Sequence, residues 1–460
     1  MFVQQFFVRG IAHSSYLLGG AKTCAIIDPQ RDVQIYLDAA QDMGMTITHI
    51  LETHLHADFI SGHMDLADRT GAAIYIPKSA RCTFNHVPVA DGDIFSIEDM
   101  HIKVLDTPGH TPEHISYVVT DRSRGAESAV LFCGDTLFVG DVGRPDLFPG
   151  MARELAAKLY ESLHTKLLTL PDFCEVCPAH GAGSLCGRNM GAKRTSSVGY
   201  ERRYNPALQI KDEEEFIRSL TEHMPAAPDH FSRCSAINGK GPRLIKDLPR
   251  LLSLDPPAFR DLVRRDTTVV LDTRAFEAFG GLHVPGSYHI DLRGNFATFA
   301  GWIIPPDKDI LLVSETPEQA REATVWLQRV GLDRAVGYLE GGMNQWAQAG
   351  FAIGRVQQIS AEELRQMAVG KRSGILVDVR APGEYEGYHL EKAINIPVQD
   401  LRTRYRELDK NLPVVIVCST GIRSSIGGSI LKMKGFADVS SVAGGMTGYS
   451  AAGYALACPV

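Results

Sequence analysis

The chain of 460 residues has no long apolar run, no tract rich in lysine or arginine, and no regular spacing of its cysteines. Because crossing a bilayer takes about 20 apolar residues in a row, no membrane is predicted. The net charge of -7 gives no reason to expect nucleic acid. The cysteines are scattered and odd in number, nine, which favours reduced thiols in a cytoplasmic protein over a disulfide scaffold. The first residues lack a basic start and predict a strand, not a signal peptide.

The length is sufficient for roughly three domains. In the first half, apolar strand patterns alternate with helical patterns, and polar residues follow directly after several strands. Loops at strand ends are where a rigid sheet holds chemistry. From about residue 200 to 257 the pattern loosens into turn residues and short helical pieces, which indicates the tail of the first domain and a connector.

An internal repeat occupies the remainder. Each copy has a strand before Asp-x-Arg, a helix, a turn with a histidine (His283, His389), Gly-Gly-Met and a helix. The Asp-to-Gly-Gly distance is 69 residues in the first copy and 66 in the second. This predicts two α/β domains of about a hundred residues that arose by duplication. The predicted domains are therefore 1–245, 246–355 and 356–460.

Residue types that bind metals gather at the strand ends of the first half. A lone histidine is usually structural or solvated, so the prediction depends on the whole collection. Neutral imidazoles with a carboxylate suit zinc or iron. The candidate ligands are His54, His56, Asp58, His63, His110, His114, Asp135 and His180.

The order and spacing of "THLHADF", "DTPGHTPEH", "FCGDTLF" and "CPAHG" resemble the metallo-β-lactamase superfold over about the first 200 residues. The resemblance implies a four-layer αβ/βα sandwich and, for the full His-x-His-x-Asp-His motif, two adjacent metals. Carried over, the first site would contain His54, His56 and His110, with Asp135 bridging or closing it. The second would contain Asp58, the residue after it, and His180.

The residue after Asp58 is Phe59, whose ring has no lone pair to donate. Asp58 and His180 alone are a weak pair for a second metal, so we expect one metal. The alternative is that Phe59 is a wall residue and that a second metal still binds through water. His56, Asp58 and His180 then remain as further ligands or as residues around the first metal.

With one metal, His54, His110 and Asp135 match the two-histidine, one-carboxylate face of non-haem Fe(II) oxygenases. The site then resembles the persulfide dioxygenases, which oxidise the outer sulfur of a low-molecular-weight persulfide to sulfite with O₂. The stretches "IIDPQRD", "GDTLFVGDVGRPDL" and "HGAGSLCG" support that branch, although it commonly has a histidine where this chain has Phe59. The implied cofactor is one Fe(II) per chain, which zinc can replace in purified protein.

Other polar and thiol residues lie near these motifs. Arg144 is expected either to contact a substrate carboxylate or to pair with Asp146. Cys174 and Cys177 would lie on opposite faces of a strand and are expected to be packing residues. Cys186, in a glycine-rich loop, is a candidate for an exposed thiol near the site.

The second copy of the repeat contains "LPVVIVCSTGIRSSIGG", which predicts a buried strand over 414–417, a loop from Cys418 and a helix from about Ser424. Inward N–H groups, a helix start and Arg423 all favour a thiolate at Cys418. The loop resembles the rhodanese active loop, Cys-x-x-Gly-x-Arg-Ser, and the likeness extends over roughly 357–458. It implies that Cys418 accepts sulfane sulfur, stabilised by Arg423 and by the loop residues Ser419, Thr420, Gly421 and Ile422.

In the first copy, Ser314-Glu315-Thr316-Pro317 replaces this loop. Without a thiol it cannot transfer sulfur in this way, so we expect an inactive rhodanese-like domain that serves as a spacer or docking surface.

The whole chain thus resembles bacterial sulfide-detoxification fusions: a metallo-β-lactamase sandwich followed by two rhodanese-like α/β domains with central parallel sheets. The predicted function is oxidation of persulfides to sulfite and exchange of sulfane sulfur through Cys418. The expected partners are a thiol persulfide, O₂, sulfite and thiosulfate. The sequence leaves open whether the chain forms a homo-oligomer. One alternative is a zinc-dependent thioester hydrolase of the glyoxalase II type fused to a sulfurtransferase. Another is a sulfur carrier or sensor in which the metal domain only regulates.

Overall fold

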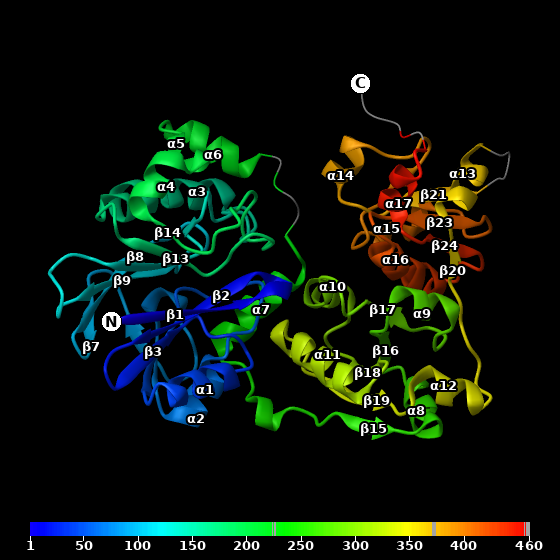
Figure 1. Ribbon diagram of the computed structural model, residues 1–460, viewed down its shortest axis with the longest axis horizontal. Helices are drawn as coiled ribbons and strands as arrows, with labels where there is room; N and C mark the ends of the chain where they lie inside the picture. The colour runs from blue at the N-terminus through cyan, green and yellow to red at the C-terminus, as the bar shows by residue number, and fades with distance from the viewer. Residues whose placement is uncertain (223, 225–226, 370–373, 455, 457–460) are drawn as a thin grey trace. The chain divides into compact units, whose positions relative to one another are not determined.

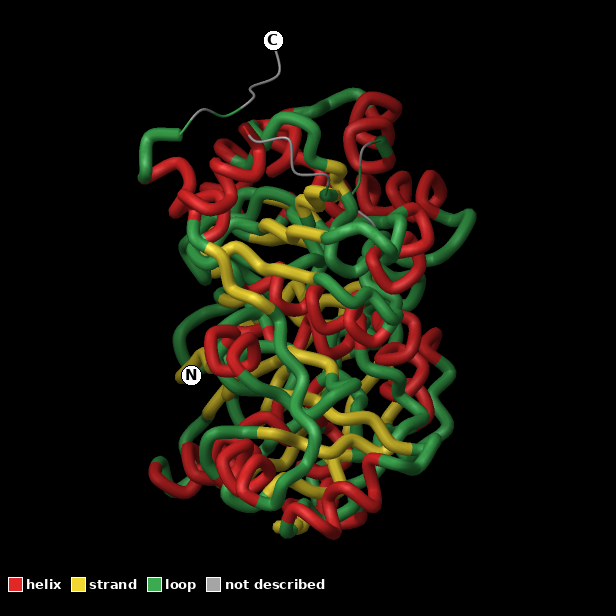
Figure 2. Tube along the Cα trace, turned by 90° about the vertical axis from the view of Figure 1, so that its right-hand side faces the viewer, coloured by secondary structure: helices red, strands yellow, loops and turns green. Residues whose placement is uncertain are grey.

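The computed structural model describes residues 1–222, 224, 227–369, 374–454 and 456. It divides into two compact units: Met1–Leu248 with Gln328–Gly331, and Pro249–Leu327 with Leu332–Val460 (Figure 1). The three domain boundaries expected from the sequence stay predictions, and the third domain extends past the last described residue. Figure 2 colours the trace by secondary structure and shows that the chain contains both helices and strands.

The first unit contains two six-stranded sheets. One has the order β1 (Phe2–Val8), β2 (His13–Gly19), β3 (Thr23–Ile27), β4 (Thr46–Leu51), β5 (Ala73–Pro77) and β6 (Val87–Val89). The other has the order β14 (Ser196–Ser197), β13 (Glu175–Pro178), β10 (Val130–Gly134), β9 (Ile115–Asp121), β8 (Met100–Asp106) and β7 (Ile94–Ile97). A small ribbon pairs β11 (Leu137–Phe138) with β12 (Asp141–Val142).

Side chains of β3 show how the layers form. Ala25 and Ile27 pack in a core shared with residues of the second sheet, whereas Cys24 and Ile26 pack on the other side with residues of the helices. Successive side chains of a strand point to opposite faces, so a strand between two layers is apolar throughout. The sheets therefore lie face to face with helices outside them, which confirms the predicted sandwich.

The helices of this unit are α1 (Gln34–Asp42), α2 (His63–Thr70), α3 (Ala152–Glu161), α4 (Val198–Tyr204), α5 (Pro206–Gln209), α6 (Glu213–Thr221) and α7 (His230–Lys240). Helices α1 and α2 cover the first sheet, and α3 and α6 pack on the second. Cys174 directly precedes β13 and Cys177 lies in it. The two side chains are buried in different cores, as expected for packing residues on opposite faces.

The second unit contains two five-stranded sheets of parallel strands with the same order. The first copy has β15 (Leu252–Leu254), β19 (Ala335–Leu339), β18 (Asp309–Val313), β16 (Thr268–Asp272) and β17 (Tyr288–His289). The second has β20 (Gln357–Ile359), β24 (Val439–Val442), β23 (Val414–Val417), β21 (Ile375–Asp378) and β22 (Ile394–Asn395). The structure thus confirms the duplication.

The helices of the first copy are α8 (Pro256–Val263), α9 (Phe276–Gly281), α10 (Phe296–Ile303), α11 (Pro317–Arg329) and α12 (Gly342–Gln348). Those of the second are α13 (Ala361–Val369), α14 (Pro382–Gly387), α15 (Leu401–Arg404), α16 (Ile422–Met433) and α17 (Gly445–Ala451). In both copies the Asp-x-Arg residues form a buried ion pair at the strand end, 2.7 Å for Asp272–Arg274 and 2.7 Å for Asp378–Arg380. These residues support the fold.

Two further expectations concern the chain as a whole. The eight cysteines within the described ranges are all free thiols. None of the described helices combines the length and the apolarity that a membrane crossing requires.

Candidate functional site

Three side chains of the first unit converge directly after strands of the two sheets. His54 follows β4, His110 lies in the loop after β8, and Asp135 follows β10. Asp135 Oδ2 lies 3.3 Å from His110 Nε2 and 3.8 Å from His54 Nε2, and all three side chains are buried. The structure thus brings the predicted triad together, within the reach of one metal ion.

The hydrogen bonds of both histidines direct their Nε2 lone pairs to this point. His110 Nδ1–H donates to the carbonyl of Arg144 at 2.9 Å. The Thr53 hydroxyl donates its hydrogen to Asp28 at 2.9 Å, so it accepts from His54 Nδ1–H, also at 2.9 Å. Each Nε2 is buried without a hydrogen-bond partner in the described part of the chain. Orphaned, oriented imidazole nitrogens beside a carboxylate fit a metal.

The protonation states also suit a metal. Burial lowers the pKa of His54 well below its usual value, and it lowers the pKa of His110. Burial opposes a charge on Asp135, but His180, His110 and His54 hold its pKa well below the usual value. Two neutral imidazoles and one carboxylate are therefore available, as metal binding requires.

His114, one of the candidate ligands, lies behind this group. Its Nε2 accepts the backbone N–H of Asp135 at 2.9 Å, and its ring stacks on His54 at 4.7 Å. Burial, with the nearby His110, lowers the pKa of His114 to about 3. Because its Nε2 is occupied by a backbone donor, His114 supports the strand end and is not available as a ligand.

His56 does not join the triad and lies in a second buried group. Its Nε2 is 3.1 Å from Asp28 Oδ1 and 3.6 Å from Glu52 Oε2. Burial opposes a charge on His56, but Asp28 and Glu52 outweigh it and raise its pKa. His63, another candidate ligand, also lies in this group, 3.3 Å from Glu52. Asp28 and Glu52 were not predicted as partners of these histidines, although both acids belong to the sequence motifs around them.

The remaining candidates form a third buried group on the other side of Asp135. His180 Nδ1–H donates to Asp135 at 2.8 Å, and its Nε2 lies 2.8 Å from Asp58. Burial works against an imidazolium, but both carboxylates raise the pKa of His180 well above its usual value. Cys186 completes this group. The expectation of an exposed thiol was wrong: Cys186 is buried, and burial raises its pKa well above the usual value.

Phe59 forms a wall between these groups. The ring is fully buried and lies 4.0 Å from His13 and 4.4 Å from His56, measured between ring centroids. The amide of Asn238, in α7, donates to the backbone carbonyls of His56 and Phe59 and so holds this segment in place. No metal ligand is supplied at this position.

Arg144 forms the ion pair that was one of its two predicted roles. Its guanidinium donates to Asp146 at 2.7 and 2.8 Å and to the carbonyl of Leu185 at 3.1 Å. Its own carbonyl orients His110. The side chain is therefore used to hold the loop, and contact with a substrate stays a prediction.

In the second unit, Cys418 directly follows β23, as predicted. Gly421, at a φ of 112°, donates its N–H to Cys418 Sγ at 3.1 Å, and Ser424 Oγ lies 3.6 Å from the same sulfur. The helix was expected from about Ser424, but α16 begins at Ile422. The left-handed conformation of Gly421 turns the chain early, so the helix starts immediately after it.

Arg423 was expected to present its charge to the sulfur, but its guanidinium is paired. It donates to Glu384 at 2.5 and 2.7 Å and to Ser419 Oγ at 2.7 Å. Ser419 in turn donates to Glu384 at 2.9 Å. Glu384 is not recognisable from the Cys418 motif itself. The signal in the sequence is that Ala278 occupies the same distance from Asp-x-Arg in the first copy.

The cysteine-less copy also reaches the Cys418 loop. Ser314, which replaces the cysteine, bonds Thr273 at 2.7 Å. The ring of Phe276, at the start of α9, lies against Gly421. The first copy therefore forms a wall of the second copy's loop, and its role as a spacer or docking surface stays a prediction.

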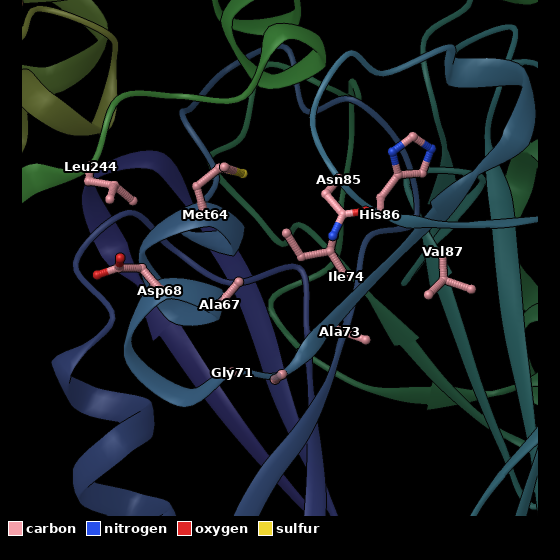
Figure 3. Close-up of a pocket in the computed structure, with 11 residues that line it drawn as sticks. Met64, Ala67, Asp68, Gly71, Ala73, Ile74, Asn85, His86, Val87 and Leu244 are labelled. Atoms are coloured by element: carbon pink, nitrogen blue, oxygen red, sulfur yellow. The ribbon is translucent and has the colours of Figure 1, made fainter.

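One hollow in the first unit lies apart from these groups. Figure 3 shows Met64, Asp68, Ile74, His86 and Leu244 around it. None of its lining residues is a candidate metal ligand, so it carries no part of the predicted chemistry.

Family models match both the first and the later part of the chain. The metallo-beta-lactamase superfamily matches residues 8–180, and the rhodanese-like domain matches 255–349 and 360–452. A solved metallo-beta-lactamase from Staphylococcus aureus subsp. aureus COL is 36% identical, with a TM-score of 0.66, and covers 74% of this chain and 98% of that chain.

Two named relatives match the first part of the chain. The hydroxyacylglutathione hydrolase of Shewanella pealeana is 35% identical in a match of 225 residues that covers 43% of this chain and 79% of that protein. The mitochondrial persulfide dioxygenase ETHE1 of Bos taurus is 30% identical over 228 residues, 47% of this chain and 80% of that protein. Similarity alone does not separate a hydrolase from an oxygenase, so the choice depends on the geometry of the ligands.

Proposed function

Because the chain belongs to the metallo-beta-lactamase superfamily and continues into two rhodanese-like domains, we propose that it is a persulfide dioxygenase fused to a sulfurtransferase. Both parts are enzyme domains; the substrates and the metal are the proposal. The partners would be a thiol persulfide, O₂, sulfite and thiosulfate.

The position of His56 is the observation that favours an oxygenase over a hydrolase for the first activity. A catalytic zinc ion commonly has three protein ligands, often histidines. Here the ring of the third histidine of the motif, His56, packs 4.2 Å from that of His54 but directs its Nε2 to Asp28 and Glu52, and it is not grouped with the triad. Two histidines and Asp135 remain, which is the ligand set of non-haem Fe(II) oxygenases.

Bound iron would supply the redox chemistry that couples O₂ to oxidation of the outer sulfur. The balanced reaction is RSSH + O₂ + H₂O → RSH + SO₃²⁻ + 2H⁺. The chain itself orients the two imidazoles through Thr53 and the carbonyl of Arg144, and His180 holds a proton against Asp135. Phe59 and His13 form an apolar and aromatic wall that limits water near these groups.

The second activity uses the Cys418 loop. The thiolate attacks the outer sulfur of thiosulfate, and sulfite leaves with the electron pair: Cys–S⁻ + S₂O₃²⁻ → Cys–S–S⁻ + SO₃²⁻. The Gly421 N–H, 3.1 Å from Cys418 Sγ, supports the negative sulfur. Sulfite is the product of the first activity and takes part in the second, which gives the fusion a chemical reason.

A zinc-dependent thioester hydrolase joined to a sulfurtransferase is the second candidate. The 35% identity to a hydroxyacylglutathione hydrolase supports it. So does the group of Asp58, His180 and Cys186, whose donor atoms lie close enough for a second ion.

Metal content and O₂ uptake together distinguish the two. We expect about one iron per chain and O₂ consumption with glutathione or coenzyme A persulfide. Asp135→Asn should lower iron content at least tenfold and abolish uptake, because the remaining pair of histidines holds iron weakly. Cys418→Ser, the matched control in the second unit, should retain uptake and lose sulfur exchange. About two zinc ions per chain, with thioester hydrolysis and no O₂ uptake, would establish the hydrolase instead.

A further inference from the structure

Glu384 lies at the rim of the Cys418 loop and contacts two of its polar side chains, Ser419 and Arg423. The carboxylate forms a two-pronged ion pair with Arg423, at 2.5 and 2.7 Å, and accepts from Ser419 at 2.9 Å. It reaches the loop from α14, a separate element that begins four residues after Asp378. One acid thus faces the loop in which a negatively charged sulfur compound must bind.

A comparison of the two copies shows that this acid occurs in the copy with the cysteine, although both copies have the same fold. Both copies retain the buried Asp-x-Arg pair, Asp272–Arg274 and Asp378–Arg380. Six residues after the aspartate, the second copy has Glu384 and the first has Ala278. The copy with Ala278 folds into the same five-stranded sheet, so the fold does not require an acid there.

The same copy lacks the other members of the group. The strand residues Val313 and Val417 pair with the two aspartates, and the residue that follows is Ser314 in one copy and Cys418 in the other. In the first turn of the following helix, Glu318 and Gln319 stand where the second copy has Arg423. Cysteine, arginine and glutamate are present together or absent together.

The ion pair changes the charge that a substrate meets. Arg423 and its neighbour Ser419 hold the pKa of Glu384 down, to about 2, although burial opposes this, so the acid is ionised at neutral pH. Burial works against the charge of Arg423, but Glu384 and, more weakly, Cys418 raise its pKa. The charge of Arg423 is therefore largely neutralised by Glu384, and the carboxylate repels a second negative charge.

We propose that Glu384 is a specificity-determining residue, which makes the Cys418 loop favour persulfide donors over the dianion thiosulfate. This inference rests on the sulfurtransferase part of the proposed function. With a persulfide, Cys–S⁻ + R–S–SH → Cys–S–SH + R–S⁻: the thiolate attacks the outer sulfur, the S–S bond breaks, and the thiol leaves with the electron pair. The sulfur end of this donor carries at most one charge, whereas thiosulfate brings two.

Rates of sulfur loading onto Cys418 test the proposal on the full chain. Loading from thiosulfate and from glutathione persulfide is followed by mass spectrometry without O₂, so that the first unit does not consume the persulfide. In Glu384→Gln the thiosulfate rate constant should rise about tenfold, the size of a charge contact of about 1.4 kcal/mol, and the persulfide rate constant should change less than about twofold. The gain should shrink at high ionic strength.

Two variants control for charge and for folding. Glu386→Gln removes an exposed acid from the same helix and should leave the ratio of the two rate constants unchanged. Glu384→Asp retains the charge and should keep the preference for persulfide.

A fall of both rate constants in Glu384→Gln would overturn the inference, because the acid would then only position Arg423. Equal gains for both donors would overturn it as well. If wild-type Cys418 accepts sulfur from neither donor, the proposed sulfurtransferase function itself is wrong.

Discussion

The ring of Phe276, in the copy without the cysteine, lies against Gly421 in the loop of Cys418. A Cβ atom on Gly421 would lie 3.0 Å from two carbons of that ring, and the φ of this residue is 112°. The backbone N–H of the same glycine donates to Cys418 Sγ. The copy without the cysteine thus shapes the Cys418 loop of the other copy.

Gly421→Ala should damage the second unit and not the first. A side chain at positive φ that also meets an aromatic ring costs about 1–3 kcal/mol, and the strain moves the N–H away from the sulfur. We expect a lower midpoint of chemical denaturation for the second unit and a loss of sulfur exchange of at least tenfold, with O₂ uptake unchanged. Gly383→Ala is the control, because a Cβ there has nothing within 4 Å. Unchanged exchange in Gly421→Ala would show that this contact does not shape the loop.

Glu52→Gln should alter which metal the first unit holds. Removing this charge weakens the attraction that keeps His56 near Glu52 and Asp28, so its imidazole becomes available to a third-histidine site. We expect the zinc-to-iron ratio of protein grown with both metals to rise severalfold, in the range of about 10–100-fold effects known for residues around metal ligands. The d–d absorption of the cobalt-substituted protein should report the added ligand. Asp42→Asn, an exposed acid on α1, is the control. An unchanged metal ratio would mean that Glu52 does not select the metal.

Phe59→His tests whether one aromatic residue limits the site to a single metal. A histidine at this position would add an imidazole next to Asp58 and near His180, which is the ligand absent from the second site. We expect the ratio of metal to chain to rise from about one toward two. Phe59→Leu, which also removes the ring but adds no ligand, should keep one metal. If wild-type protein already holds two ions, Asp58, His180 and Cys186 bind the second and Phe59 is a wall only.

The ion pair of Glu384 should stabilise the second unit in a defined pH range. Arg423 lowers the pKa of Glu384 in the folded state to about 2, against a usual value of 4.5, despite opposing burial. A depressed acid stabilises the fold above its unfolded pKa, and this contribution is lost as the pH falls through the folded pKa. The difference in denaturation midpoint between wild type and Glu384→Gln should therefore be full at pH 6 and should shrink between about pH 4.5 and about pH 2. A difference that stays constant over this range would contradict the ion pair.

Much of the fold and part of the site could be predicted from the sequence. His54 and Asp135 both follow strands, in loops where a rigid sheet holds chemistry, so they could be expected to serve one site although they are far apart in the chain. Cys418 was recognisable because strand, cysteine, glycine and arginine are contiguous. The interaction partners of these residues were not recognisable, because Glu384 approaches Arg423 from another helix and Glu52 meets His56 across a bend of the chain.

The sequence by itself determined the layered α/β class, the duplication, the residue types of the metal group and the thiol at Cys418. These properties depend on local order: apolar periodicity, the spacing of motifs and the residues next to each strand. Only the tertiary structure decided that His56 turns to Asp28, that Cys186 is buried, and that Arg423 is paired. Those outcomes depend on which side chains compete for a charge in space, and burial strengthens such competition between groups from distant segments.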